Sequence, residues 1–160
     1  MTVRPIRRDD VPAVVSLVRE LAEYEKALHE VRLTEEQLTA CLFGESPALF
    51  GHVAESADGE VVGMALWFRN FSTRRGTHGV YLEDLYVRPQ HRGTGLGREL
   101  LRTLAAVCVE RGYSRLEWSV LDWNAPSIDF YKAAGAVPMD EWTVFRLTDE
   151  ALSAFAADRR

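Results

Sequence analysis

The segment "YVRPQHRGTGLGREL", from Tyr86 to Leu100, is the feature that most constrains what this chain can fold into. The preceding run "VYLEDLYV" has the composition of a strand, and Pro89 ends it because proline cannot donate to a sheet. From Leu96 onward, apolar residues recur at the three- and four-residue spacing of a helix with one buried face. Between these two elements stand Gly93, Gly95 and Gly97. The chain must therefore contain a strand that passes through a glycine turn directly into a helix.

Several phosphate-binding motifs use glycines at such a turn. A P-loop needs Lys and then Ser or Thr after its last glycine, but Gly97 is followed by Arg98 and Glu99. A dinucleotide fingerprint needs the spacing G-x-G-x-x-G, and here the third glycine falls one residue early. The remaining functional interpretation is an anion site made by free backbone N–H groups at a helix N-terminus. The alternative is a surface turn in which glycine only supplies positive φ.

Strand-like and helix-like patterns alternate along the rest of the chain. Residues 2–7 predict an edge strand, Val11 to Ala22 a helix, and the capping box "TEEQ" at Thr34 a second helix that stops near Gly44. The next pattern predicts a hairpin that turns at Asp58–Gly59, and the strand and helix around the glycines follow it. The last patterns predict a strand in "RLEWSVL", a helix in "APSIDFYKAAG" and a strand in "WTVFRL". This order predicts a mixed sheet flanked by helices.

Composition narrows the classes of partner. The net charge is −5, and no Lys/Arg cluster is interleaved with aromatic residues, which argues against nucleic-acid binding. No apolar run approaches the roughly 18 residues of a membrane span, and the N-terminus does not have the pattern of a signal peptide. Cys41 and Cys108 lie far apart within helix-like patterns, so we expect free thiols and a cytoplasmic protein. The histidines are scattered, so no metal site is predicted.

Two further places carry polar residues that need an explanation. Glu83 and Asp84 are adjacent carboxylates in an otherwise apolar strand and should point to opposite faces. Either a bulge or sheet end leaves both solvated, or the strand splays from its neighbour and a carboxylate meets a cationic amine or a water. In the segment "WNAPSIDFYKAAGA", Asn124 and Ser127 can cap a helix or bind a ligand. Tyr131 lies on the same helix face, where a core aromatic is the alternative.

The order of these motifs resembles the GNAT superfamily of N-acetyltransferases. The segments "RELAEYEK", "YLEDLYV", "RGTGLG" and "DWNAPSIDFYKAAGA", with the late Trp142, are similar to the diamine (spermidine/spermine) acetyltransferases and their thialysine-acetylating relatives. The resemblance implies an α/β (α+β) GNAT fold with a mixed, mostly antiparallel sheet of roughly six to seven strands and a cleft between splayed strands. It also implies that residues 1–160 form a single acetyltransferase domain and that the protein is a homodimer.

The resemblance further implies a set of site residues. Tyr131 and Glu83 would be catalytic. Contacts with acetyl-CoA would come from Leu85, Tyr86, Val87, Arg92, Gly93, Thr94, Gly95, Leu96, Gly97, Arg98, Asn124, Ser127 and Tyr131. The cationic amine would meet Tyr24, Glu25, Glu83, Asp84, Glu117, Trp118, Ser119, Asp140 and Trp142, with Glu141 as the alternative to Asp140.

The expected reaction is acetyl transfer from acetyl-CoA to a primary amine of a diamine, polyamine or lysine-like substrate by direct attack in a ternary complex. An alkylammonium with a pKa near about 10.4 must first lose a proton, which Glu83 would accept directly or through a water. A backbone N–H near Leu85 would polarise the thioester, and Tyr131 would protonate the leaving thiolate. The alternatives are another acceptor, such as an aminoglycoside, a metabolite or a protein amine, and a sensor that binds acyl-CoA without turnover.

Overall fold

A single sheet of five strands organises the first 121 residues, with the strands side by side in chain order. The strands are β1 (Thr2–Pro5), β2 (Phe50–Glu55), β3 (Val61–Ser72), β4 (Thr77–Val87) and β5 (Leu116–Glu117). The first four pair antiparallel, whereas β4 and β5 run parallel. The predicted mixed, mostly antiparallel sheet is therefore confirmed.

The structure is a computed structural model in which residues 1–159 are described. Contacts between Cα atoms divide it into two units, Met1–Leu121 and the residues from Asp122 onward. The first unit holds the sheet and the helices α1 (Val11–Tyr24), α2 (Glu35–Phe43) and α3 (Leu96–Arg111), with short 3-10 turns at Arg8–Asp10, Leu28–Glu30 and Pro89–His91. The second unit holds α4 (Ala125–Ala133) and α5 (Asp149–Ala157).

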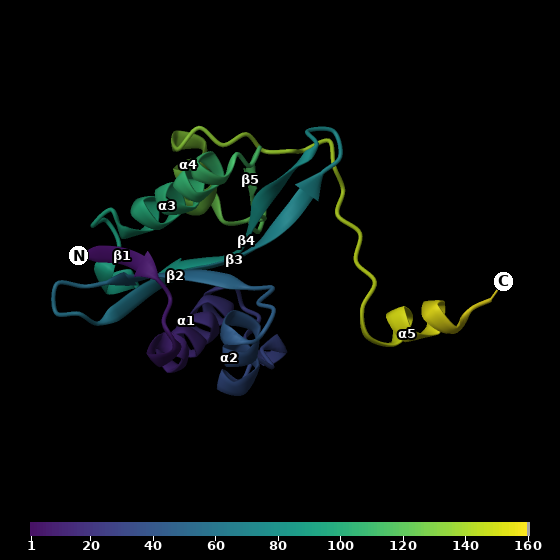
Figure 1. Cartoon of the computed structure of the whole chain (residues 1–160), viewed down its shortest axis with the longest axis horizontal. Coiled ribbons are helices and arrows are strands. Elements are labelled where there is room, and N and C mark those ends of the chain that lie inside the picture. The colour runs from purple at the N-terminus through teal and green to yellow at the C-terminus, as the bar shows by residue number, and fades with distance from the viewer. Residues whose placement is uncertain (160) are drawn as a thin grey trace. The chain divides into compact units, whose positions relative to one another are not determined.

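Helices cover both faces of the sheet. In Figure 1, α1 and α2 lie against one face and α3 lies against the other. On the α1 side, Val14 and Leu17 pack with Leu38 of α2 and with Val53, Met64, Leu66 and Tyr86 of the sheet. On the α3 side, the fully buried side chains include Leu100 and Leu104. The buried stripes are the ones that the three- and four-residue spacing predicts.

The helix ends follow from the residues that stand at them. Thr34 and Gln37 form the predicted capping box, in which the Gln37 N–H donates to Thr34 Oγ1 at 3.1 Å and the Thr34 N–H donates to Gln37 Oε1 at 3.0 Å. Gly112 ends α3 in the left-handed conformation, as expected for a residue just past a helix. Asn124 caps α4, and its Oδ1 accepts from the Ser127 N–H at 3.4 Å.

The strand count is smaller than the predicted six to seven. The predicted strand "RLEWSVL" forms only Leu116–Glu117, and residues 142–147, "WTVFRL", form no strand. A strand exists only where a neighbour accepts and donates its backbone hydrogen bonds, and residues 122–159 contain no other strand to supply them. Val144 and Phe145 stay 81% and 92% exposed. Composition alone does not show whether such a partner is present.

A partly buried ion cluster fixes the start of the chain to the sheet. Arg4 on β1 donates from Nη1 and Nη2 to the two oxygens of Asp10 at 2.7 and 2.9 Å, and from Nε to Glu55 on β2 at 2.7 Å. The Arg7 N–H also donates to Asp10, at 2.7 Å. The Arg4 guanidinium lowers the pKa of Asp10 below its ordinary value. Asp10 therefore anchors the entry to α1 through its carboxylate.

We expect Asp10→Asn to lower the free energy of unfolding by about 2 kcal/mol at pH 7, because it leaves half of a buried charged pair unmatched. Since folding lowers the pKa of Asp10, its stabilisation is present above the ordinary pKa and is lost as the pH falls through the folded value. The difference between wild type and variant should therefore shrink below about pH 4. Urea unfolding across pH measures it. Asp9→Asn, at the exposed neighbouring position, is the control, and an equal loss there would contradict the assignment.

Candidate active site

A β-bulge in β4 places the predicted catalytic carboxylates. Leu66 on β3 pairs with Asp84, but the next residue, Trp67, pairs with Leu82, so Glu83 is an extra residue with no partner on β3. Leu66 belongs to the core on the α1 side, whereas Arg111 of α3 lies over the Trp67 ring. Cross-strand partners share a face, so Asp84 lies on the α1 side and Leu82 on the α3 side.

The bulge that the sequence left open is present, but it does not leave both carboxylates solvated, because Asp84 is partly buried. Residues 82 and 84 would share a face in a regular strand, yet here they lie on opposite faces because Glu83 is inserted between them. Glu83 is exposed, and Asp84 is partly buried. The bulge therefore directs one carboxylate to solvent and the other toward the end of α1.

Three carboxylates influence one another at this position. Burial raises the pKa of Asp84 to about 7, with further contributions from the negative charges of Glu83 and of Glu25, which follows α1. Burial also raises the pKa of Glu25. No hydrogen bond or ion pair reaches the Asp84 carboxylate from any residue between 1 and 159. An unpaired, partly buried carboxylate of this kind is typical of functional sites.

The glycine turn leaves a row of backbone donors free. In residues 1–159, no N–H group from Gly93 to Arg98 donates to a protein acceptor, and the first donor of the helix is Glu99, which bonds Gly95 O at 2.9 Å. Gly93 and Gly95 have φ angles of 76° and 87°, and a Cβ at either would meet no atom within 4 Å. Their conformation, rather than close packing, requires glycine. The exposed turn therefore presents its amides and the positive end of α3 to solvent.

Arg92 connects this turn to α1. Its Nε donates to Val87 O at 3.0 Å, and its guanidinium carbon lies 5.5 Å from the ring centroids of both Tyr24 and Tyr86. The sequence predicted Arg92, Tyr24 and Tyr86 as separate contacts with substrate or acetyl-CoA and did not show that the two rings lie against the Arg92 guanidinium. A signal was present in the spacing, since Tyr24 directly precedes Glu25 and Tyr86 lies two residues beyond Asp84.

The short strand β5 pairs with only part of β4, and the splay of these two strands stays a prediction. The only pairs between them are Val80 with Leu116 and Tyr81 with Glu117. From Leu82 to Val87, β4 therefore has no neighbouring strand on the β5 side within residues 1–159. Main-chain groups along this edge, which includes Leu85, are available to a ligand that lies beside the strand.

The residues predicted near β5 have protein partners of their own. Glu117 accepts from Arg115 Nε at 2.8 Å and from Asn70 Nδ2 at 3.1 Å. Ser119 Oγ shares a hydrogen bond of 2.8 Å with the Tyr81 hydroxyl. Trp118 lies between them in the chain and is partly buried. These contacts place Glu117 and Ser119 beside β3 and β4 rather than beside the glycine turn.

The remaining predicted residues belong to the second unit. Asn124 is buried at the start of α4, with Ser127 in the first turn of that helix. The Tyr131 ring lies 5.5 Å from the ring of Phe130, measured between centroids. Asp140 and Trp142 are exposed in the segment that follows α4.

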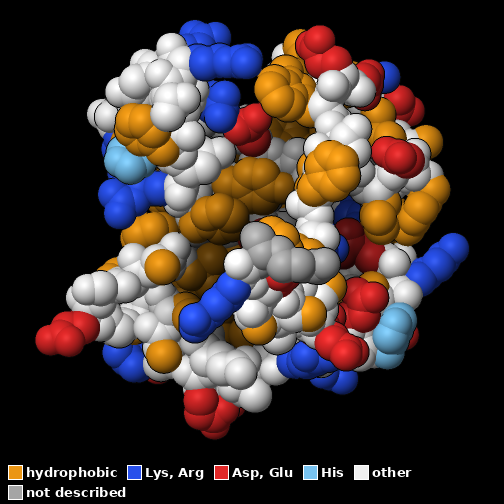
Figure 2. Space-filling view, turned by 90° about the vertical axis from the view of Figure 1, so that its right-hand side faces the viewer, with side chains coloured by type: hydrophobic (Ala, Val, Ile, Leu, Met, Phe, Trp, Pro, Cys, Tyr) orange, Lys and Arg blue, Asp and Glu red, His pale blue; other side chains and the backbone are white. Residues whose placement is uncertain are grey.

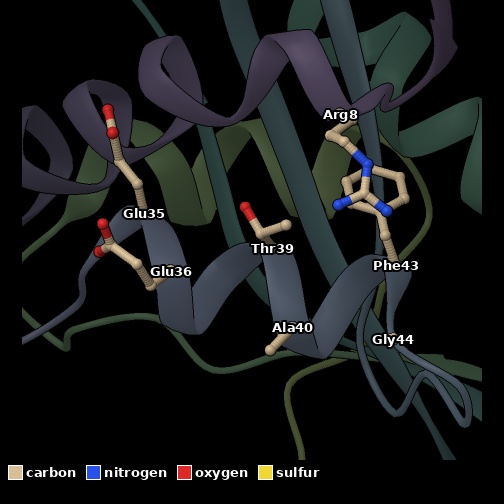
Figure 3. A pocket seen from close by; sticks show the side chains of 7 residues that line it. All are labelled: Arg8, Glu35, Glu36, Thr39, Ala40, Phe43 and Gly44. Carbon is tan, nitrogen blue, oxygen red and sulfur yellow. The ribbon is translucent and has the colours of Figure 1, made fainter.

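Other surface features do not coincide with these residues. An open depression beside α2 is lined by Arg8, Glu35, Glu36, Thr39, Ala40, Phe43 and Gly44, and the Arg8 guanidinium lies over the Phe43 ring (Figure 3). Acidic and basic side chains are mixed over the face in Figure 2. Among residues 1–159, no three His, Cys, Asp or Glu side chains are grouped as metal ligands. No helix in that range is long and apolar enough to cross a bilayer.

Comparison with known proteins decides the family. Residues 14–136 match the model of the acetyltransferase (GNAT) family. The chain belongs to this family. It is therefore an acetyl-CoA-dependent N-acetyltransferase, and the free amides of the glycine turn fit the phosphate groups of that co-substrate.

Curated relatives match this acetyltransferase over nearly its whole length. The thialysine N-epsilon-acetyltransferase of Bos taurus is 42% identical, with 96% of each chain covered. The Caenorhabditis elegans protein of the same name is 37% identical, covering 98% of this chain and 95% of its own. The L-ornithine N5-acetyltransferase of Arabidopsis thaliana is 30% identical, covering 91% and 83%.

Solved structures share the fold of this GNAT protein. An integron cassette protein from the mobile metagenome of V. cholerae superimposes with a TM-score of 0.81 at 24% identity, covering 98% of each chain. An aminoglycoside acetyltransferase from an uncultured soil metagenomic sample superimposes with a TM-score of 0.77 at 17% identity, covering 93% of this chain and 96% of its own. These likenesses confirm the predicted GNAT fold class.

We expect Gly95→Ala to weaken binding of CoA about tenfold, because holding alanine at positive φ costs about 1 to 2 kcal/mol and the turn relaxes away from its anion-binding arrangement. Isothermal titration calorimetry measures the affinity. Gly59→Ala is the matched control, since Gly59 has a φ of 81° and open space around it but lies in the β2–β3 turn. The two variants should lose similar stability, and equal affinity for CoA in both would contradict the role of the turn.

Proposed function

We propose that this acetyltransferase moves the acetyl group of acetyl-CoA to the side-chain amine of thialysine or a similar lysine-like amine or small diamine. The observation that carries the proposal is the 42% identity with a thialysine N-epsilon-acetyltransferase over nearly the whole chain. The carboxylates Glu25, Glu83 and Asp84 support it, because a cationic amine compensates their charge.

The glycine turn is the proposed holder of acetyl-CoA. Its unbonded N–H groups from Gly93 to Arg98, together with Arg92, suit a pyrophosphate. The unpaired edge of β4 from Leu85 to Val87 supplies main-chain donors and acceptors for the adjoining part of the co-substrate. Asn124, Ser127 and Tyr131 complete the proposed set by family resemblance. Acetyl-CoA supplies the activated acetyl group.

The amine is proposed to bind on the α1 side of β4. Glu25, Glu83 and Asp84 provide negative charge there, and the exposed Tyr24 ring provides an apolar wall for an alkyl chain. Glu117, Trp118, Ser119, Asp140 and Trp142 are the further proposed contacts by family resemblance. A substrate with two cationic groups, such as an amino acid with a side-chain amine or a diamine, suits several separated carboxylates.

The proposed reaction is direct attack of the neutral amine on the acetyl group. An alkylammonium keeps its proton at pH 7, so a base must accept it first. Glu83 is the proposed acceptor, directly or through a water, because the bulge exposes its carboxylate. The N–H groups near Leu85 stabilise the developing oxyanion, and Tyr131 donates a proton to the departing sulfur.

The acceptor is tested by following release of CoA thiol with a panel of amines. We expect the highest kcat/KM with thialysine, followed by lysine, ornithine and diamines, and a lower value with aminoglycosides, because the carboxylates select a compact alkylammonium. Equal rates across the panel would contradict the lysine-like acceptor. Binding of acetyl-CoA without turnover of any amine would instead support a sensor.

We also propose that residues 1–160 act as one domain in a cytoplasmic homodimer. The family match spans both units, and Cys41 and Cys108 are free thiols. Exposed apolar side chains after α4, among them Val144, Phe145 and Phe155, give a second copy a surface to cover.

The dimer is tested by sedimentation equilibrium at micromolar concentration. We expect twice the chain mass of 18.1 kDa. Phe145→Ser should shift the equilibrium toward monomer, whereas Phe71→Ser, at another exposed position, should not. A monomer at all concentrations would contradict the proposal.

A further inference from the structure

The bulge gives the two adjacent carboxylates of β4 unequal surroundings. Glu83 has no partner residue on β3 and faces solvent. Asp84 lies opposite Leu66 of β3 and is partly buried on the α1 side. The two residues are neighbours in the chain, and the negative charge of Glu83 acts on Asp84. An exposed carboxylate and a partly buried one therefore stand at neighbouring positions of β4.

We propose that Asp84 is the final acceptor of the proton that the amine releases, and that Glu83 passes the proton to it from the exposed rim. This inference rests on the proposed acetyl transfer to an amine and adds a second proton-carrying residue to it. An N–H bond of the ammonium breaks, its electron pair stays on nitrogen for the attack, and the proton moves to a Glu83 oxygen and then to an Asp84 oxygen. Asp84 later returns the proton to water through Glu83.

The charges around Asp84 make it the better proton acceptor. Glu83 on its own strand and Glu25 from the end of α1 both repel a negative charge on Asp84, and its partner on β3, Leu66, is apolar. Two arginines of this region contact other groups. Arg92 lies against Tyr24 and Tyr86, and Arg88 pairs with Glu20 and Glu60. No described cation therefore holds Asp84 in its charged form.

The raised pKa makes Asp84 a stronger base than an ordinary aspartate. The pKa of Asp84 is raised from 3.8 to about 7, mainly by burial. Each unit of pKa is a factor of ten in the proton-transfer equilibrium with the amine, so the shift improves that equilibrium by about three powers of ten. An acceptor that titrates near neutral pH also gives the proton back to water readily between turnovers.

Asp84→Asn and Glu83→Gln separate the two roles in the pH dependence of kcat/KM. The activity of the wild type should fall as the pH drops through about 7, and this fall is the acidic limb of its pH profile. Asp84→Asn should lower kcat about 100-fold and abolish this limb near neutrality, since the group that titrates there is gone. Glu83→Gln should lower kcat but keep the limb and move it to lower pH, because one negative neighbour of Asp84 is removed. Glu25→Gln should move the limb the same way, because Glu25 is the other negative neighbour of Asp84.

Stability provides a control against simple misfolding. Because folding raises the pKa of Asp84, the ionised form is unfavourable in the fold, and wild type should lose stability as the pH rises from about 4 to about 7. Asp84→Asn should remove this loss and be at least as stable as wild type at pH 8. An inactive but stable variant supports a role in proton transfer. A limb that persists near pH 7 in Asp84→Asn would overturn the proposal.

A direct measurement keeps this inference separate from the proposed function. Carbon-13 NMR of the side-chain carboxyls follows the titration of Asp84 with and without lysine, used as the amine probe at saturating concentration. A bound ammonium should lower the midpoint of Asp84 by about one pH unit. If wild type releases no CoA with any amine, the proposed function fails. An unchanged Asp84 midpoint on addition of the amine would overturn the role of Asp84 whether or not turnover is seen.

Discussion

The pairing of β3 with β4 is the constraint on which the rest of the site depends. These central strands share the longest register of the sheet, from Gly63 with Val87 to Ser72 with Thr77. At this point β4 has one residue more than β3, and the extra residue, Glu83, forms a bulge. Leu82 and Asp84, on the two sides of the bulge, therefore lie on opposite faces of the sheet. Asp84 and Tyr86 thereby lie on the α1 side, and Val87 leads into the glycine turn. A single inserted residue thus places the Asp84 carboxylate on the α1 side of the sheet.

The same strand carries the anion-binding feature. Pro89 and the short 3-10 turn end β4, and positive φ at Gly93 and Gly95 starts α3 without using the first amides. Arg92 then holds the turn against Tyr24 and Tyr86 and bonds back to Val87. The turn and the acidic cluster are therefore two ends of one short stretch of chain. This proximity suits a reaction that joins a phosphate-bearing thioester to a cationic amine.

The electrostatics of the site are maintained at a cost to stability. Asp84 is held without a cation beside two other carboxylates, which is unfavourable for the folded state once Asp84 ionises. The Arg4–Asp10–Glu55 cluster shows the opposite arrangement, in which each buried charge is matched. One chain therefore holds both a carboxylate whose charge is matched by a cation, Asp10, and one whose charge is not, Asp84.

The sequence by itself determined the helices, the caps and the glycine turn, because these depend on spacing and on single residues such as Thr34, Gly95 and Gly112. It also carried the family resemblance, which named the site residues. Only the tertiary structure decided which face Asp84 occupies, because the bulge depends on the register between two strands and not on the composition of either. It likewise decided that "WTVFRL" forms no strand in this chain and that Glu117 is paired with Arg115, since both depend on which neighbour supplies a partner.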